Sequence, residues 1–86
     1  MYENNDPHYI QTDVDDLFHE LSNIEFTVSN ADSISIIIED IESGLELLET
    51  KSKEMSEDTD LCNYIGKKYL EINSYKDKLA QIREAL

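Results

Sequence analysis

The sequence contains one cysteine, one proline, two glycines and no tryptophan among its 86 residues. The single cysteine, Cys62, cannot form an internal disulfide, and no spacing of cysteine and histidine suggests a zinc site. Two glycines are too few for a glycine-rich loop that cradles a phosphate, and no nucleophile motif such as G-x-S-x-G occurs. We therefore expect a protein without enzymatic activity, bound metal or cofactor.

Long apolar runs are also missing. No segment approaches the roughly 20 apolar residues that cross a bilayer as a helix. The residues after Met1 form neither the basic region nor the apolar region of a secretory signal. These features predict a soluble, cytoplasmic protein that does not enter a membrane.

Lysine and arginine are absent from the first 50 residues, which carry 13 of the 20 aspartates and glutamates. Residues 51–86 hold the other seven acids together with all seven bases. The net charge of −13 therefore belongs to the first part of the chain. Such a charge argues against direct binding to nucleic acid or anionic lipid, because both require a positive protein surface. A charged partner is expected to be a basic protein.

Apolar residues recur at alternating intervals of three and four over most of the chain, which is the period of an α-helix. Residues 33–36 alternate between serine and isoleucine like a strand. The helical period continues on both sides of these four residues, so a helix is predicted there too. The predicted helices cover residues 12–28, 31–56 and 59–86. Cap and turn formers at residues 29–32 favour a break, although the first two helices could also be continuous.

The segment before the first predicted helix has no apolar period. Residues 1–11 contain the only proline, and a flexible N-terminal arm is expected there. Thr12 is predicted to cap the first helix because Asp15 follows three positions later. Residues 12–86 are then expected to form a single helical domain.

The expected fold is all-α, either an antiparallel helical hairpin or a three-helix bundle. A chain of this length builds only a small core, and self-association is a common way to stabilise one. The heptad-like spacing therefore predicts a homo-oligomer held by a coiled-coil seam. The seam residues are Leu17, Leu21, Ile24, Val28, Ile34, Ile38, Ile41, Leu45 and Leu48.

Carboxylates form rows on the predicted helices. Side chains three and four residues apart lie about 5–6 Å from one another on a helix surface. A stiff row of carboxylates with this spacing can occupy a channel built for phosphates, where lysines and arginines lie. The residues predicted to bind a partner are Asp13, Asp16, Glu20, Asp32, Glu39, Glu42, Glu46 and Glu49.

A simpler interpretation is that these acids flank the core and face water. The lysines of the last helix could then pair with them, as charges beside a coiled-coil seam do. These lysines are Lys67, Lys68, Lys76 and Lys78. Seven bases cannot neutralise 20 acids, however, and like charges at i, i+4 cost a few tenths of a kcal/mol per pair. An unneutralised surface retained at this cost favours a basic partner.

In size and charge the chain resembles small acidic helical proteins of phages and other mobile elements. Some of these proteins block CRISPR nucleases, restriction enzymes or other DNA-handling proteins by occupying the DNA site. The resemblance implies an inhibitor that mimics DNA. Two alternatives remain open: a homodimeric helical scaffold or assembly protein, and an antitoxin or immunity protein that masks a basic toxin surface.

Overall fold

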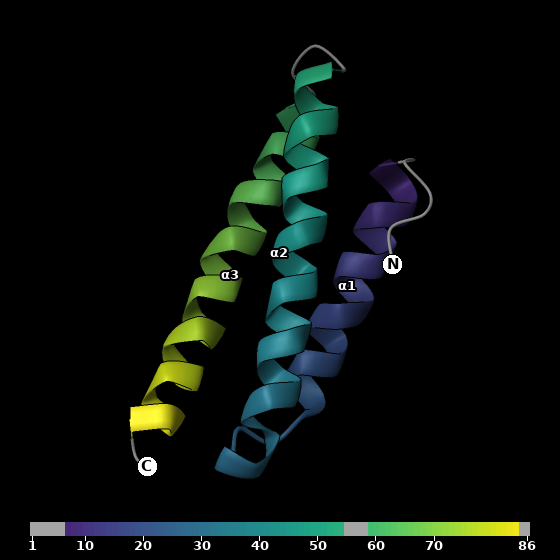
Figure 1. Ribbon diagram of the computed structural model, residues 1–86. Coiled ribbons are helices and arrows are strands. Elements are labelled where there is room, and N and C mark those ends of the chain that lie inside the picture. The colour runs from purple at the N-terminus through teal and green to yellow at the C-terminus, as the bar shows by residue number, and fades with distance from the viewer. Residues whose placement is uncertain (1–6, 55–58, 85–86) are drawn as a thin grey trace.

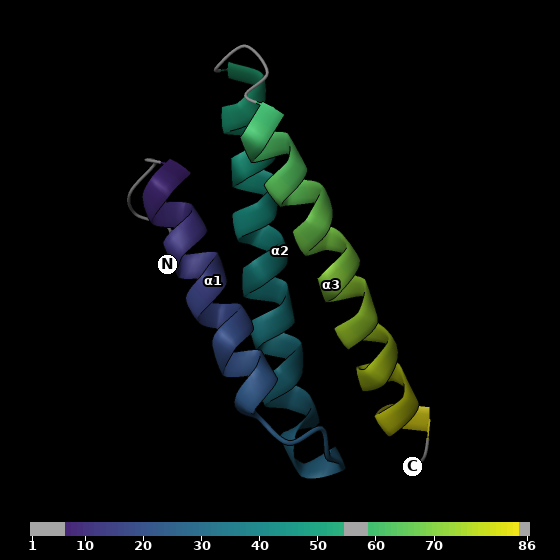
Figure 2. The same ribbon diagram turned by 180° about the vertical axis from the view of Figure 1, so that it is seen from behind.

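The computed structural model describes residues 7–54 and 59–84. These residues form three α-helices and one short 3-10 helix (Figure 1). The elements are α1 (Pro7–Asn23), η1 (Val28–Asn30), α2 (Ala31–Glu54) and α3 (Thr59–Glu84). Neighbouring helices along the chain run antiparallel, and α2 lies between α1 and α3 in both views (Figure 2). The all-α prediction and the three-helix bundle are confirmed, and the serine–isoleucine alternation of residues 33–36 lies inside α2.

The hydrophobic core lies along the faces that α1 and α3 turn toward α2. Apolar residues three, four and seven positions apart fall on one side of a helix, which explains why these faces are buried. From α1 the core takes Ile10, Val14, Leu17, Phe18 and Leu21. From α2 it takes Ala31, Ile34, Ile37, Ile38, Ile41, Leu45 and Leu48, and from α3 Leu61, Ile65, Ile72 and Leu79. The wider apolar face of α2 fits its central position, because it packs against a helix on each side.

Most of the predicted seam belongs to this intramolecular core. Seven of its nine residues are buried within the single chain: Leu17, Leu21, Ile34, Ile38, Ile41, Leu45 and Leu48. The other two lie in the connection between α1 and α2, where Ile24 is partly buried and Val28 is 47 % exposed. The period in the sequence arises from packing between helices of one chain. Self-association stays a prediction.

The first helix begins at Pro7, ahead of the predicted cap Thr12. Proline is favoured at the first helical position because its missing N–H has no partner there in any case. The Thr12 hydroxyl donates a hydrogen bond to the carbonyl oxygen of His8 over 3.0 Å, as threonine does inside a helix. The predictions of a cap at Thr12 and of an arm reaching residue 11 are therefore wrong for residues 7–11, and residues 1–6 lie outside the described residues.

The break between the first two helices is present but begins earlier than the cap and turn formers at residues 29–32. Asn23 and Ser22 both donate side-chain hydrogen bonds to the carbonyl oxygen of His19, over 3.0 and 2.8 Å, at the end of α1. Asn30 then donates to the carbonyl oxygen of Glu25 over 3.0 Å and closes the turn. These local bonds replace helical ones, so α1 and α2 are separate helices and the first helix ends before residue 28.

Side chains from α1 and the turn also reach α3. The ring of Phe26 stacks on Tyr75 with centroids 5.6 Å apart, and Phe18 lies 6.3 Å from the same ring. At the opposite end, near the α2–α3 connection, the Ser52 hydroxyl and the Cys62 thiol lie 3.1 Å apart. Contacts at both ends therefore hold α3 in place against the other two helices.

Candidate acidic binding surface

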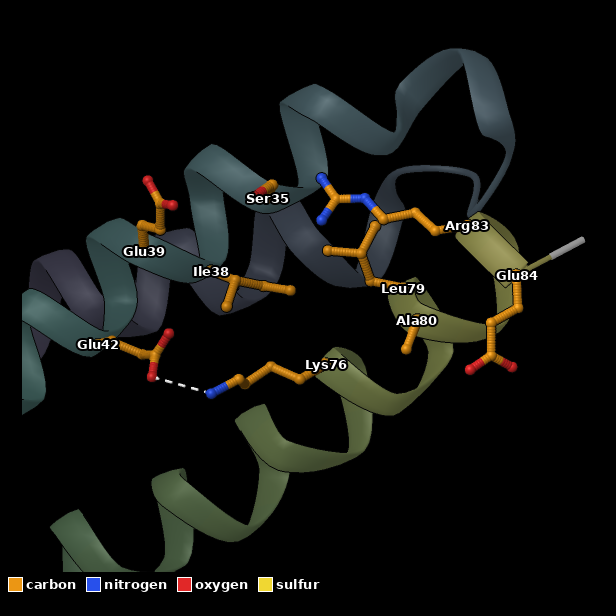
Figure 3. Close-up of a pocket in the computed structure, with 9 residues that line it drawn as sticks. All are labelled: Ser35, Ile38, Glu39, Glu42, Lys76, Leu79, Ala80, Arg83 and Glu84. Carbon is orange, nitrogen blue, oxygen red and sulfur yellow. Dashed lines mark hydrogen bonds and ion pairs between the residues drawn. The ribbon is translucent and has the colours of Figure 1, made fainter. Parts of the chain in front are cut away.

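The carboxylate row of α2 follows the flank that borders α3 and consists of Glu39, Glu42, Glu46 and Glu49. Glu42 accepts a hydrogen bond from Lys76 Nζ over 3.2 Å across the two helices (Figure 3). Both side chains are partly exposed, so this ion pair contributes less than about 1 kcal/mol to stability. The contact shows which side of α2 the row occupies.

A second glutamate of the row contacts α3 near the other end. Burial raises the pKa of Tyr69 from 10.0 to about 12, and a hydrogen bond to the Glu49 side chain adds to the shift. The negative charges of Glu49, Glu46 and Glu42 raise this pKa further. The phenol therefore stays protonated and donates its hydrogen to a carboxylate. Three members of the row thus act together on one partly buried phenol.

Glu39 and Glu46, which alternate with these two, are exposed. Neither forms an ion pair with any residue between 7 and 54 or between 59 and 84. In Figure 3 the carboxylate of Glu39 points away from Lys76, while that of Glu42 points toward it. A groove of about 460 Å³ lies between α2 and the C-terminal half of α3, with Glu39 on its edge. The row therefore has two members bound to α3 and two that face solvent.

The carboxylates of α1 divide in a similar way. Asp15 accepts a hydrogen bond from the Tyr64 hydroxyl over 2.7 Å and lies 3.7 Å from Lys68 Nζ, so it binds α3. Each residue advances about 100° around a helix, which places the predicted row on the side of α1 opposite Asp15 and Phe18. This row is Asp13, Asp16 and Glu20. Among the described residues none of the three has an ion-pair partner.

Asp32 lies in the first turn of α2 and is exposed. A carboxylate at this position interacts favourably with the positive end of the helix dipole, typically by about 0.3–1 kcal/mol. Asp32 therefore has a structural role of its own, and its charge remains accessible to a partner.

The two rows do not merge into one. The row of α2 lies on the flank beside α3, and the row of α1 is turned away from α3. Between them lies the outward face of α2, on which Ile36 and Ser43 are exposed. Glu39 and Glu46 of α2 and the row of α1 therefore lie on opposite sides of this outward face.

The bases of α3 are engaged mainly within the bundle. Lys68 Nζ lies 4.9 Å from the centre of the Phe18 ring and also pairs with Asp15 and Glu71. Lys78 Nζ lies 5.8 Å from the Phe26 ring and 5.3 Å from the Tyr75 ring. These two lysines therefore lie over aromatic rings of the bundle and not beside the carboxylate row of α2.

Of the four lysines expected to pair with the carboxylates of α2, only Lys76 does so among the described residues. The contacts of Asp15 were not predicted from the sequence. Its partners Tyr64 and Lys68 lie 49 and 53 residues further along the chain, and no local sequence pattern indicates such contacts.

Charge is unevenly distributed among the helices. The first helix has four carboxylates and no lysine or arginine, and α2 has seven carboxylates against two lysines. The last helix has four carboxylates against five bases. The molecule therefore has a strongly acidic side, made by α1 and α2, and a side of nearly balanced charge, made by α3.

Neither a metal site nor a membrane span is found in the described part of the chain. Within residues 7–54 and 59–84, no three histidine, cysteine or acidic side chains gather closely enough to hold a metal ion. The described helices also lack a stretch long and apolar enough to cross a bilayer. Comparison with protein-family models, with curated proteins and with solved structures finds no match.

Proposed function

We propose that the protein is a non-enzymatic inhibitor that binds a basic, nucleic-acid-binding protein and presents carboxylates where that protein would hold phosphates. The accessible carboxylates of α1 and α2 are the observation that supports this proposal. The lysines of α3 lie close by, yet Glu39, Glu46 and the row of α1 form no ion pair with them. Their negative potential is therefore available to a partner.

The helical placement of the acidic residues adds support. The rows lie on helices whose opposite faces are buried in the core, so the backbone positions that carry the carboxylates recur at regular intervals. Ligand groups held in place before binding lose less conformational entropy when the complex forms. A preorganised row can therefore compete with the regularly spaced phosphates of a nucleic acid more effectively than a flexible acidic tail.

Electrostatic attraction also predicts how binding proceeds. Complementary charge speeds the encounter of two proteins, and the effect falls with ionic strength because salt screens exposed charges. An inhibitor of this kind associates quickly and releases more readily at high salt. Membership among the inhibitors of phages or mobile elements, including those that act against CRISPR nucleases, is part of the same proposal.

The test begins with co-purification of the partner from the native host. Displacement of labelled DNA from that partner is measured at low salt, and the affinity of the protein for the partner is measured directly at rising salt concentration. This affinity should fall at least about tenfold between 50 and 200 mM salt, since several ion pairs are screened together. A partner that keeps its DNA, or an affinity that does not change with salt, would contradict the proposal.

An antitoxin or immunity protein would use the same carboxylates against a different target, and the identity of the co-purified partner separates the two. A homodimeric scaffold built on the seam would need the bundle to open, because most seam side chains are buried inside one chain. Light scattering at micromolar concentration tests this alternative, which predicts a dimer.

A further inference from the structure

Ile36 is the isoleucine of α2 that the fold leaves outside the core. Its side chain is 59 % exposed, whereas the neighbouring Ile34, Ile37 and Ile38 are buried. A β-branched residue loses rotamer freedom in a helix, so an exposed isoleucine has a small cost there and adds little to packing. The stability of the bundle does not account for Ile36.

The surroundings of Ile36 are acidic. Residues three and four positions away are its nearest neighbours on the helix surface, and Asp32, Glu39 and Asp40 are three of the four. An apolar side chain bordered by charged ones has the arrangement of a protein interface, in which an apolar anchor is surrounded by a polar rim. The outward face of α2 therefore presents an apolar side chain, Ile36, bordered by carboxylates.

The charge around Ile36 indicates which kind of surface would cover its side chain. A second copy of the chain docked through the same face would bring the same carboxylates together, and the like charges would repel. A basic surface would instead pair with Asp32 and Glu39 while covering the isoleucine. Nucleic-acid-binding grooves commonly combine lysines and arginines with aromatic side chains on which bases stack.

We propose that Ile36 takes the place of a base in such a groove and packs against an aromatic side chain of the partner, while the flanking carboxylates take the places of phosphates. This inference rests on the proposed function and specifies its target as a protein that stacks unpaired bases. A partner that reads only the phosphates of a duplex would gain nothing from Ile36.

The test uses two synthetic peptides of equal length and equal lysine content. One has tryptophan and the other has serine between the lysines. The wild-type protein should bind the tryptophan peptide about tenfold more tightly than the serine peptide, because the ring covers the isoleucine. Ile36→Ser should remove this difference, and Ile36→Trp should preserve or increase it. Both variants are compared with the wild type by circular dichroism for helix content.

Leu70→Ser provides the matched control. Leu70 is 74 % exposed on α3, and none of its neighbours at three or four positions is a carboxylate. This variant should keep the wild-type preference for the tryptophan peptide. Equal affinities of the wild type for the two peptides would overturn the inference, as would an unchanged preference in Ile36→Ser or an equal loss in Leu70→Ser. Failure of the wild type to bind either peptide at low salt would instead contradict the proposed function itself.

Discussion

Truncation of two neighbouring isoleucines of α2 should have very different effects on stability. Ile38 is 3 % exposed and Ile36 is 59 % exposed. In a helix these two residues face different directions, whereas in a strand residues 34, 36 and 38 would share one face. Ile36→Ala and Ile38→Ala therefore compare a side chain outside the core with one inside it, within the same local sequence.

The expected magnitudes follow from burial. Ile38→Ala removes a core side chain and leaves a cavity, which should lower the free energy of unfolding by about 3 kcal/mol. That is a large part of the roughly 4–13 kcal/mol typical of a chain this long. Ile36→Ala removes mostly exposed surface and replaces isoleucine by the best helix former, so its effect should stay within about 0.5 kcal/mol.

Urea denaturation followed by circular dichroism measures both variants against the wild type. The midpoint should fall sharply for Ile38→Ala and barely change for Ile36→Ala, with similar slopes for all three proteins. Equal losses in the two variants would refute the assignment of faces on α2, because they would place both isoleucines in the core.

Two further predictions concern α3. Gly66→Ala should raise the free energy of unfolding by about 0.5–1 kcal/mol in the same urea assay. A Cβ at this position meets no atom within 4 Å, and alanine favours the helix. A loss of stability would show that there is no room for a Cβ at this position. The raised pKa of Tyr69 means that the folded state holds the phenolic proton more tightly than the unfolded state. The protonated phenol therefore contributes its full stabilisation below pH 10.0, and this contribution is lost as the pH rises toward about 12. Urea midpoints over this range should therefore fall more steeply for the wild type than for Tyr69→Phe, and equal slopes would contradict the contact with Glu49.

The sequence predicted the helices well where apolar spacing is long and regular. Ile34, Ile38, Ile41, Leu45 and Leu48 keep a helical period over most of α2, and this outweighs the short alternation at residues 33–36. The period does not say which chain covers an apolar face, however. The same spacing serves a coiled coil between copies and a bundle within one chain. The sequence therefore predicts a seam between copies, whereas the structure places most of these residues in the core of one chain.

Boundaries depended on side chains with two possible roles. Thr12 can cap a helix or bond to a carbonyl inside one, and its bond to His8 shows the second role. Ile24 continues the apolar period although the chain has already left α1, because its side chain packs on the core from the turn. A local pattern could not separate these cases, since the difference is made by tertiary packing.

The sequence predicts which carboxylates make up the candidate site. It does not predict which of them pair with α3 and which remain accessible. The spacing that groups Glu39 with Glu42 is visible in the sequence, yet only the docking side of α3 decides that Glu42 is paired and Glu39 is accessible. Long-range contacts such as Asp15 with Lys68 likewise depend on the assembled bundle. Substitutions at the exposed carboxylates therefore test partner binding without breaking contacts with α3.

Charge reversal of the two exposed glutamates of α2 tests whether these carboxylates bind the partner in place of phosphates. Glu39→Lys with Glu46→Lys leaves the Glu42 and Glu49 contacts with α3 in place, and Asp77→Lys with Glu84→Lys makes the same change in net charge on α3. The measurement is the concentration of each variant that displaces DNA from the co-purified partner at low salt. We expect a loss of at least about tenfold for the α2 variant and a much smaller change for the α3 variant. Equal losses would mean that only total charge matters, and an unchanged α2 variant would mean that its carboxylates do not take the place of phosphates.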